Sequence, residues 1–350
     1  MVALWLVGIS GCGHSSGANV LYAVGVGSPN VTIFDVESGG ALEITGNSVS
    51  TGSAPDVIAI DPLLRFAYVI DSAGGVGAGG VSQYVLTRKN GALTIATFSS
   101  TNGSTPAATP VPTGVNPISM AVDGTGYFVF VANQGSSSLS GFAIDQIGGT
   151  LTEIKQLPPT TLNCMTNQIT PCPLPTAGAP TALSTTGSML FVAMTNAEAG
   201  SIATYIFNPE PTPPPLTPTA CPGGPGCLQS PPASTVAAGT NPVAMALDSS
   251  GKFLFVADST NNTVMEFSIG SSGQLSAVGS PIATGTTPVS VQVSQSGFVF
   301  TANQGSNNVS AFSFGSSGLT AVSGSPFSVM PGTGPSYVLV DGSGNFLFVA

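Results

Sequence analysis

A phrase of about 18 residues recurs along the chain and constrains its fold more than any other feature. The clearest copies are NPISMAVDGTGYFVFVAN at 116–133, NPVAMALDSSGKFLFVAD at 241–258 and TPVSVQVSQSGFVFTAN at 287–303. Weaker copies stand at 54–71, 179–194 and 334–350. Self-similarity at a period of about 40–50 residues is typical of repeat architectures, in which each unit buries its apolar face against its neighbours.

Each unit can be divided into four short strands. The first starts at a proline, as at Pro117, and continues with alternating apolar residues. Proline has no N–H and is therefore suited to the first position of a strand. A turn with Asp and Gly follows, a second strand of the FVFVA type comes next, and a third has an aromatic three residues after an apolar one. Four antiparallel strands per unit predict a propeller blade, and the lack of a helical period argues against a solenoid.

The number of units predicts seven blades, with the first and the last incomplete. The chain opens on VLYAV at 20–24, which has the pattern of a second strand without a first strand before it. The last unit stops at Ala350 within a second strand. We therefore expect an all-β, seven-bladed propeller of four-stranded antiparallel blades over residues 19–350, truncated at its C-terminus and short of strands in one blade.

Two features resemble a known family. The step Val131-Ala-Asn133 and the proline-started first strand resemble the YVTN-type propeller repeat. The aromatic of the third strand followed by Gly-x-Leu, as at 91–93 and 273–275, is similar to the seven-bladed lactonase-like propellers, the family that holds propeller-type 6-phosphogluconolactonases. This resemblance covers nearly all of residues 20–350. It implies a seven-bladed propeller, and the activity it implies is a lactonase-type hydrolase that opens a sugar lactone.

The charge composition excludes some partners. Charged residues make up 6% of the chain, and the net charge is −10. A nucleic-acid partner would require a basic patch, which five scattered Lys and Arg residues do not provide. A phosphorylated sugar is disfavoured for the same reason, because phosphate is recognised by clusters of Arg or Lys.

The first 18 residues have the pattern of a lipoprotein-type signal and tether. Val2–Ile9 is a short apolar run, too short to span a bilayer, and Ile9-Ser-Gly-Cys12 resembles a bacterial lipobox. This predicts lipidation of Cys12, membrane attachment through it, and export to the bacterial cell envelope (periplasm or outer membrane) or outside the cell. The alternative is an ordinary apolar N-terminus, since no Lys or Arg precedes the run.

The other four cysteines form two close pairs in the longest connections. They are Cys164 with Cys172 and Cys221 with Cys227. An even number in an exported chain predicts disulfides, whose connectivity the sequence leaves open. The spacing does not match that of zinc ligands, so no metal is expected. The second pair lies in a proline-rich insertion at about 208–233, which predicts an extended surface loop.

The chain offers few groups for catalysis, and no cofactor is expected. The only histidine is His14, so a Ser-His-Asp arrangement is not available within the propeller. Dispersed acids that could act as general bases are Asp56, Asp71, Asp258 and Glu266. Asp258 is the weak catalytic candidate among them. The acids that recur at the turn between the first two strands are instead attributed to repeat architecture: Asp61, Asp123, Asp248 and Asp341.

One polar set is left as a candidate ligand site. Its members follow the second strand or precede the first strand of a blade, two positions that share one face of a propeller. They are Asn116, Asn133, Asn241, Asp258 and Asn303. They predict a polar ring at the channel mouth for a glycan or a protein ligand, and the alternative is turn chemistry. The sequence thus favours an exported, lipid-anchored binding or scaffold module, with a lactonase-type hydrolase as the alternative.

Overall fold

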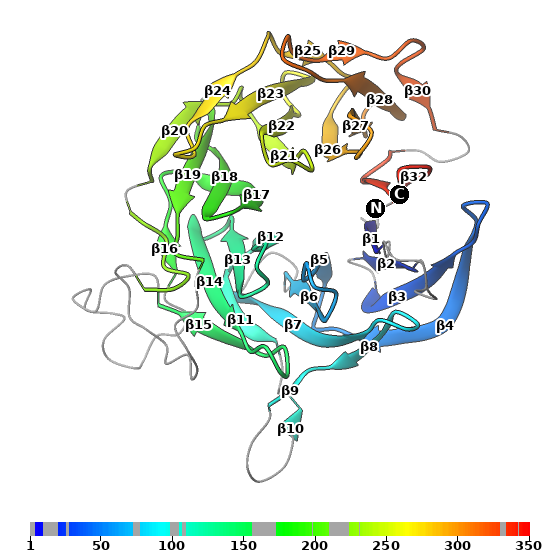
Figure 1. The fold of residues 1–350 in the computed structure, drawn as a ribbon, viewed down its shortest axis with the longest axis vertical. Helices are drawn as coiled ribbons and strands as arrows, with labels where there is room; N and C mark the ends of the chain where they lie inside the picture. Colours follow the sequence, from blue (N-terminus) through cyan, green and yellow to red (C-terminus); the bar gives the residue numbers. More distant parts are fainter. Residues whose placement is uncertain are drawn as a thin grey trace.

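The protein is a propeller built from β-sheets. The computed structural model describes residues 4–9, 20–25, 28–72, 78–98, 105–106, 110–155, 173–197, 199–209, 224–230, 232–329, 334–341 and 343–350. All regular structure in these ranges is β-strand. Figure 1 shows the sheets arranged radially around an axis, in chain order from blue to red. The predicted all-β propeller is confirmed.

Six blades have four or five strands each, and the blades follow one another along the chain. The first holds β1 (Leu4–Ile9), β2 (Val20–Gly25), β3 (Ser28–Val36) and β4 (Leu42–Ser50). The second holds β5 (Pro55–Ile60), β6 (Phe66–Asp71), β7 (Ala78–Thr87), β8 (Ala92–Ile95) and β11 (Val111–Val115). The third holds β12 (Pro117–Val122), β13 (Phe128–Asn133), β14 (Ser138–Ile144), β15 (Leu151–Ile154) and β16 (Leu174–Pro175).

The remaining blades repeat this arrangement. The fourth holds β17 (Ala179–Thr186), β18 (Met189–Thr195), β19 (Gly200–Ile206) and β20 (Ser234–Ala237). The fifth holds β21 (Pro242–Leu247), β22 (Phe253–Asp258), β23 (Thr263–Ile269), β24 (Leu275–Ala277) and β25 (Ile282–Ala283). The sixth holds β26 (Pro288–Val293), β27 (Phe298–Asn303), β28 (Asn308–Ser313), β29 (Thr320–Ala321) and β30 (Phe327–Ser328). A seventh sheet pairs β31 (Val338–Val340) with β32 (Leu347–Val349), and a separate hairpin pairs β9 (Thr97–Phe98) with β10 (Thr105–Pro106).

Strand β1 is an inner strand that the sequence analysis did not expect. It pairs antiparallel with β2, from Leu4 opposite Gly25 to Ile9 opposite Val20. The prediction that VLYAV has no strand before it is therefore wrong, because the apolar run taken for a leader forms that strand here. Cys12 lies outside the described residues, so its lipidation stays a prediction.

The first strands of the seven blades form a ring around the axis. They contact one another in the order β1, β5, β12, β17, β21, β26 and β31, and β31 contacts β1. The seventh blade thus contributes an inner strand to the ring, and the predicted number of blades is confirmed. This ring forms the wall of the central channel.

The hydrophobic cores lie between neighbouring blades. Phe128 and Phe130 of the third blade pack on Phe207 of the fourth, with ring centroids 6.2 and 4.9 Å apart. All three side chains are buried. Polar side chains add links between blades: the hydroxyl of Tyr68 donates to the carbonyl of Gly149 in the next blade at 3.0 Å. Apolar burial of this kind is worth about 1.5–3 kcal/mol per large side chain, which explains why the blades are stable only as a stack.

The recurring turn aspartates cap the second strands. The Oδ1 atom of Asp123 accepts hydrogen bonds from the backbone N–H groups of Tyr127 at 2.9 Å and Phe128 at 2.7 Å. Equivalent bonds are made by Asp61, Asp248 and Asp341. Their assignment to repeat architecture is therefore confirmed.

Candidate functional site

A bulge at the start of five inner strands leaves one residue of each strand out of the pairing. In β12 the register with β13 slips between Pro117 and Ser119, so Ile118 is left out of the pairing. The same slip occurs in four other blades, at Asp56, Thr181, Val243 and Val289. A bulge places two residues opposite one, bends the strand and re-aims its side chain. We call these five residues the bulge positions.

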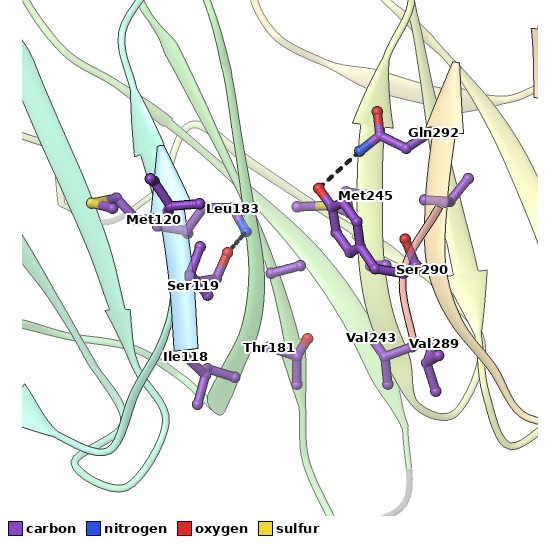
Figure 2. A pocket seen from close by; sticks show the side chains of 16 residues that line it. Ile118, Ser119, Met120, Thr181, Leu183, Val243, Met245, Val289, Ser290 and Gln292 are labelled. Carbon is purple, nitrogen blue, oxygen red and sulfur yellow. Dashed lines mark hydrogen bonds between the residues drawn. The ribbon is translucent and has the colours of Figure 1, made fainter. Parts of the chain in front are cut away.

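The inner strands enclose a cavity of about 160 Å³. Four of the bulge positions line it, and Figure 2 shows them at one end of their strands: Ile118, Thr181, Val243 and Val289. Asp56 occupies the corresponding position on β5, whose next two residues, Val57 and Ile58, also line the cavity. Most of the lining is aliphatic, and none of the described lining residues carries a charge.

The polar side chains of the lining hold neighbouring inner strands together. Three of them bridge consecutive blades: Ser119 Oγ accepts from Leu183 N at 3.0 Å, Thr181 Oγ1 donates to Pro242 O at 2.5 Å, and Ser290 Oγ accepts from Val338 N at 3.3 Å. These bonds run across the gaps between strands that are not paired by a ladder. In these bonds Thr181 uses its hydroxyl hydrogen, whereas Ser119 and Ser290 each use a lone pair of the hydroxyl oxygen.

Tyr337 and Gln292 form a further polar pair in the lining. The Nε2 group of Gln292 donates to the Tyr337 hydroxyl at 3.2 Å, as drawn in Figure 2. Burial raises the pKa of Tyr337 to about 12, although the bond from Gln292 counteracts this. The phenol is therefore neutral at ordinary pH and serves as a hydrogen-bonding group.

Three residues of the predicted polar ring, the set proposed from the sequence, are buried within the blades and lie outside the cavity. Asn133, Asp258 and Asn303 end the second strands of three blades, and each is 0% exposed. Asn133 Oδ1 accepts a hydrogen bond from Gly114 N at 3.0 Å, which fixes the segment before the first strand of the same blade. The amide of Asn303 lies 2.9 Å from Ser310 Oγ. Their contacts are those of turn chemistry, the alternative interpretation of this set.

Asp258 has hydrogen bonds to both of its oxygens. Oδ1 accepts from the backbone N–H groups of Asn241, Thr260 and Asn261, and Oδ2 accepts from Thr240 N and the Asn261 side chain. Burial by itself raises the pKa of Asp258, but these donors outweigh it and the pKa lies below its usual value. A carboxylate stabilised in this way is a weak proton acceptor, which disfavours it as a general base.

The other two residues of the predicted polar ring directly precede the first strand of their blades, a position called the rim here, and are half-buried. Asn116 adopts a left-handed backbone with a φ of 51° and donates from Nδ2 to Gln134 Oε1 at 3.2 Å. Asn241 donates from Nδ2 to Ser259 Oγ at 2.8 Å. The structure thus brings the five predicted residues to one end of the blades without gathering them around the cavity. A ligand-binding role for them stays a prediction.

Two buried acids have at least one carboxylate oxygen without a hydrogen-bond partner. Asp71 is 3% exposed; its Oδ2 accepts from Ser82 Oγ at 2.6 Å, but its Oδ1 has no hydrogen bond. Burial raises the pKa of Asp71 to about 6. Glu266, on β23, is also 3% exposed, and neither of its oxygens has a hydrogen-bond partner. Burial raises the pKa of Glu266 to about 7.

The sequence analysis missed the residues that line the cavity, notably Ser290, Gln292 and Tyr337. Asp56 was named only as one dispersed acid. Its place among the bulge positions follows from the register slip.

Several predictions concern residues beyond the described ranges. Cys164, Cys172 and Cys221 lie outside them, and Cys227 is 2% exposed within the core between the third and fourth blades. Both disulfides stay predictions. Among the residues described, there is no group of three or more His, Cys, Asp or Glu side chains arranged to hold a metal. These residues also contain no helix long and apolar enough to cross a membrane.

Comparison with known proteins identifies the family. The family model described as "Lactonase, 7-bladed beta-propeller" matches residues 84–166 and 227–335, more than half of the chain. No curated protein sequence matches the chain.

Solved structures share the fold at low sequence identity. A protein from Lactobacillus plantarum has a TM-score of 0.64 at 15% identity, covering 100% of this chain and 89% of its own. A candidate 6-phosphogluconolactonase from Bacteroides uniformis has a TM-score of 0.64 at 16% identity, with coverage of 100% and 88%. Hydrazine synthase from Kuenenia stuttgartiensis has a TM-score of 0.61 at 13% identity, with coverage of 95% and 89%. These likenesses establish the propeller fold, and with the family match they lead to one conclusion: the chain belongs to the lactonase family of seven-bladed β-propellers.

Proposed function

We propose that the protein is a lactonase-type hydrolase that binds its lactone at the central channel and opens the ring with water. The observation that carries this proposal is the axial cavity, whose wall includes strands β12, β21 and β26 from the segments matched by the lactonase family model. Concave, mostly apolar sites with a few polar groups are typical of small-molecule binding.

Asp56 is our candidate for the general base. It is the one carboxylate among the five bulge positions, and it is partly exposed. In the proposed reaction, water attacks the lactone carbonyl while the Asp56 carboxylate accepts a water proton. The ring C–O ester bond then breaks, the proton passes to the departing alkoxide, and the product is a hydroxy acid. Asp56 is preferred to Asp258, which is fully buried and whose lowered pKa makes it a weak proton acceptor.

The lining disfavours a phosphorylated substrate. No Lys or Arg is among the described residues that line the cavity, and the chain has a net charge of −10. Phosphate recognition generally uses bidentate or clustered cationic groups. We therefore propose an uncharged lactone.

A second candidate is a non-catalytic binding module, exported and anchored through Cys12. The lack of Lys, Arg and His among the described residues that line the cavity favours it, because an oxyanion would find no cationic group there. Its ligand would be a glycan or a protein at the rim near Asn116 and Asn241.

A pH-stat assay of lactone opening distinguishes the two candidates. The wild type and Glu43→Gln, a control at an exposed site on β4, should hydrolyse an uncharged lactone at equal rates. Asp56→Asn should lose at least 100-fold in kcat with an unchanged circular dichroism spectrum, which is the lower end of the usual contribution of a general base. Full activity in Asp56→Asn would refute the role of Asp56. Absence of hydrolysis in the folded wild type, whatever the lactone, would favour the binding module.

A further inference from the structure

The chemistry of the cavity wall indicates which lactone would fit. Aliphatic and thioether residues of consecutive inner strands are among those that line the cavity: Ile118, Met120, Leu183, Val243, Met245 and Val289. Figure 2 shows these side chains on the strands around the cavity. Met120 and Leu183 also pack into the cores between blades. Binding of a hydrocarbon group against these apolar side chains is favourable, because it removes apolar surface from water.

The polar groups of the wall do not compensate for a ligand rich in hydroxyls. Ser119, Thr181 and Ser290 already bond to backbone groups of the neighbouring inner strand. A polyhydroxylated ring entering this cavity would lose its hydrogen bonds to water and find few replacements. Unpaired polar groups of this kind disfavour binding.

Four bulge positions line the cavity at one end, its mouth, and Asp56 occupies the equivalent position on β5. Among the bulge positions, Asp56 is the only charged residue and Thr181 the only other polar one. An elongated ligand would therefore place its apolar part inside and its polar part at the mouth beside Asp56. This orientation puts a lactone carbonyl next to the proposed base.

We propose, on the basis of the hydrolase function proposed above, that the substrate is a lactone with a hydrocarbon substituent and not a sugar lactone. The hydrocarbon occupies the cavity, and the lactone ring lies at the mouth. The volume of about 160 Å³ suits a short chain, because an apolar protein cavity of about 150 Å³ is known to hold benzene. Water adds to the carbonyl, the ring C–O bond breaks, and the resulting alkoxide takes the proton held by Asp56, giving a hydroxy acid with the same chain.

The test is a series of γ-lactones with side chains from hydrogen to hexyl, compared with glucono-δ-lactone. We expect kcat/KM to rise about fourfold per added CH₂ until the cavity is full, and glucono-δ-lactone to be the poorest substrate. Val243→Thr is isosteric and places a hydroxyl in the wall. It should flatten the dependence on chain length, whereas the control Val115→Thr, at an exposed site 38% accessible, should not.

Calorimetry with 2-alkylcyclopentanones, which resemble the lactones but cannot be hydrolysed, measures binding separately from turnover. Affinity that increases with chain length supports the apolar site, and affinity that is independent of chain length overturns it. Faster hydrolysis of glucono-δ-lactone than of every alkyl lactone would overturn the inference and leave the hydrolase proposal standing. If no lactone of either kind is opened, the hydrolase proposal fails, and with it the assignment of a substrate.

Discussion

Asp71 is predicted to destabilise the protein at neutral pH, and Asp71→Asn should remove that cost. Asp71, Asn133 and Asn303 occupy the same position at the end of the second strand in three blades. In the third blade, Asn133 donates from Nδ2 to Ser140 Oγ at 3.0 Å. Ser82 is the equivalent serine in the second blade, and there it bonds to a carboxylate that is 3% exposed and has one oxygen without a partner.

The magnitude follows from the pKa. Burial raises the pKa of Asp71 from 3.8 to about 6, although the bonds from Ser82 and Gly52 oppose the rise. At 1.36 kcal/mol per pKa unit, the folded state disfavours the ionised form by about 3 kcal/mol. Because the folded pKa is the higher one, the folded state binds the proton more tightly. The cost is therefore absent below pH 4, grows between pH 4 and 6, and is complete above pH 6.

Asparagine cannot ionise and can donate to Ser82. We expect Asp71→Asn to increase the free energy of unfolding by up to about 3 kcal/mol at pH 8 and by little at pH 4. Urea denaturation followed by circular dichroism at pH 4, 6 and 8 measures this directly. The matched control is Asp258→Asn, which should lose about 1–3 kcal/mol at pH 8, because that carboxylate accepts several N–H donors. An effect of Asp71→Asn that does not depend on pH would refute the reasoning.

Two further predictions concern packing between blades and buried charge. Glu266→Gln should increase the free energy of unfolding by about 1–3 kcal/mol at pH 8.5 and have little effect at pH 4, because burial raises the pKa of Glu266 from 4.5 to about 7. Urea titrations at both pH values test this, and equal effects at the two pH values would contradict it. Gly149→Ala should lower the free energy of unfolding by about 2–4 kcal/mol, because the glycine has a φ of +75° and an added Cβ would lie 2.3 Å from Phe66 Cδ1. The control Gly187→Ala, with a φ of +55° and open space around it, should lose only the backbone part, about 1–2 kcal/mol, and equal losses in both variants would argue against the clash.

Much of the fold could be predicted because each repeat contains its own turn chemistry and apolar pattern. Asp123 and its counterparts identify the first hairpin of a blade, and the aromatics of the second and third strands identify the interfaces between blades. The inner strand β1 was missed because an apolar run of its length fits both a leader and a buried strand. Pairing with β2, which is a tertiary property, distinguishes the two in this structure.

The candidate site was predicted less well, and the reason is local geometry. The sequence placed Asn133, Asp258 and Asn303 on the correct end of the blades. It did not reveal that their side chains turn into the blade to hold the preceding segment. A register slip of one residue decides which side chains face the channel, and strict alternation along a strand does not show such a slip.

The bulge positions also affect how readily this scaffold can change its ligand. Because Ile118 and its counterparts lie outside the strand pairing, their side chains can be exchanged without altering the ladder, although at Thr181 the exchange would remove a hydrogen bond to the next blade. The sequence already uses Asp, Ile, Thr and Val there on nearly the same backbone. A combinatorial library restricted to the other four sites would therefore sample new recognition surfaces at small risk to folding, and it would allow a designer to choose charge and polarity at the entrance one blade at a time.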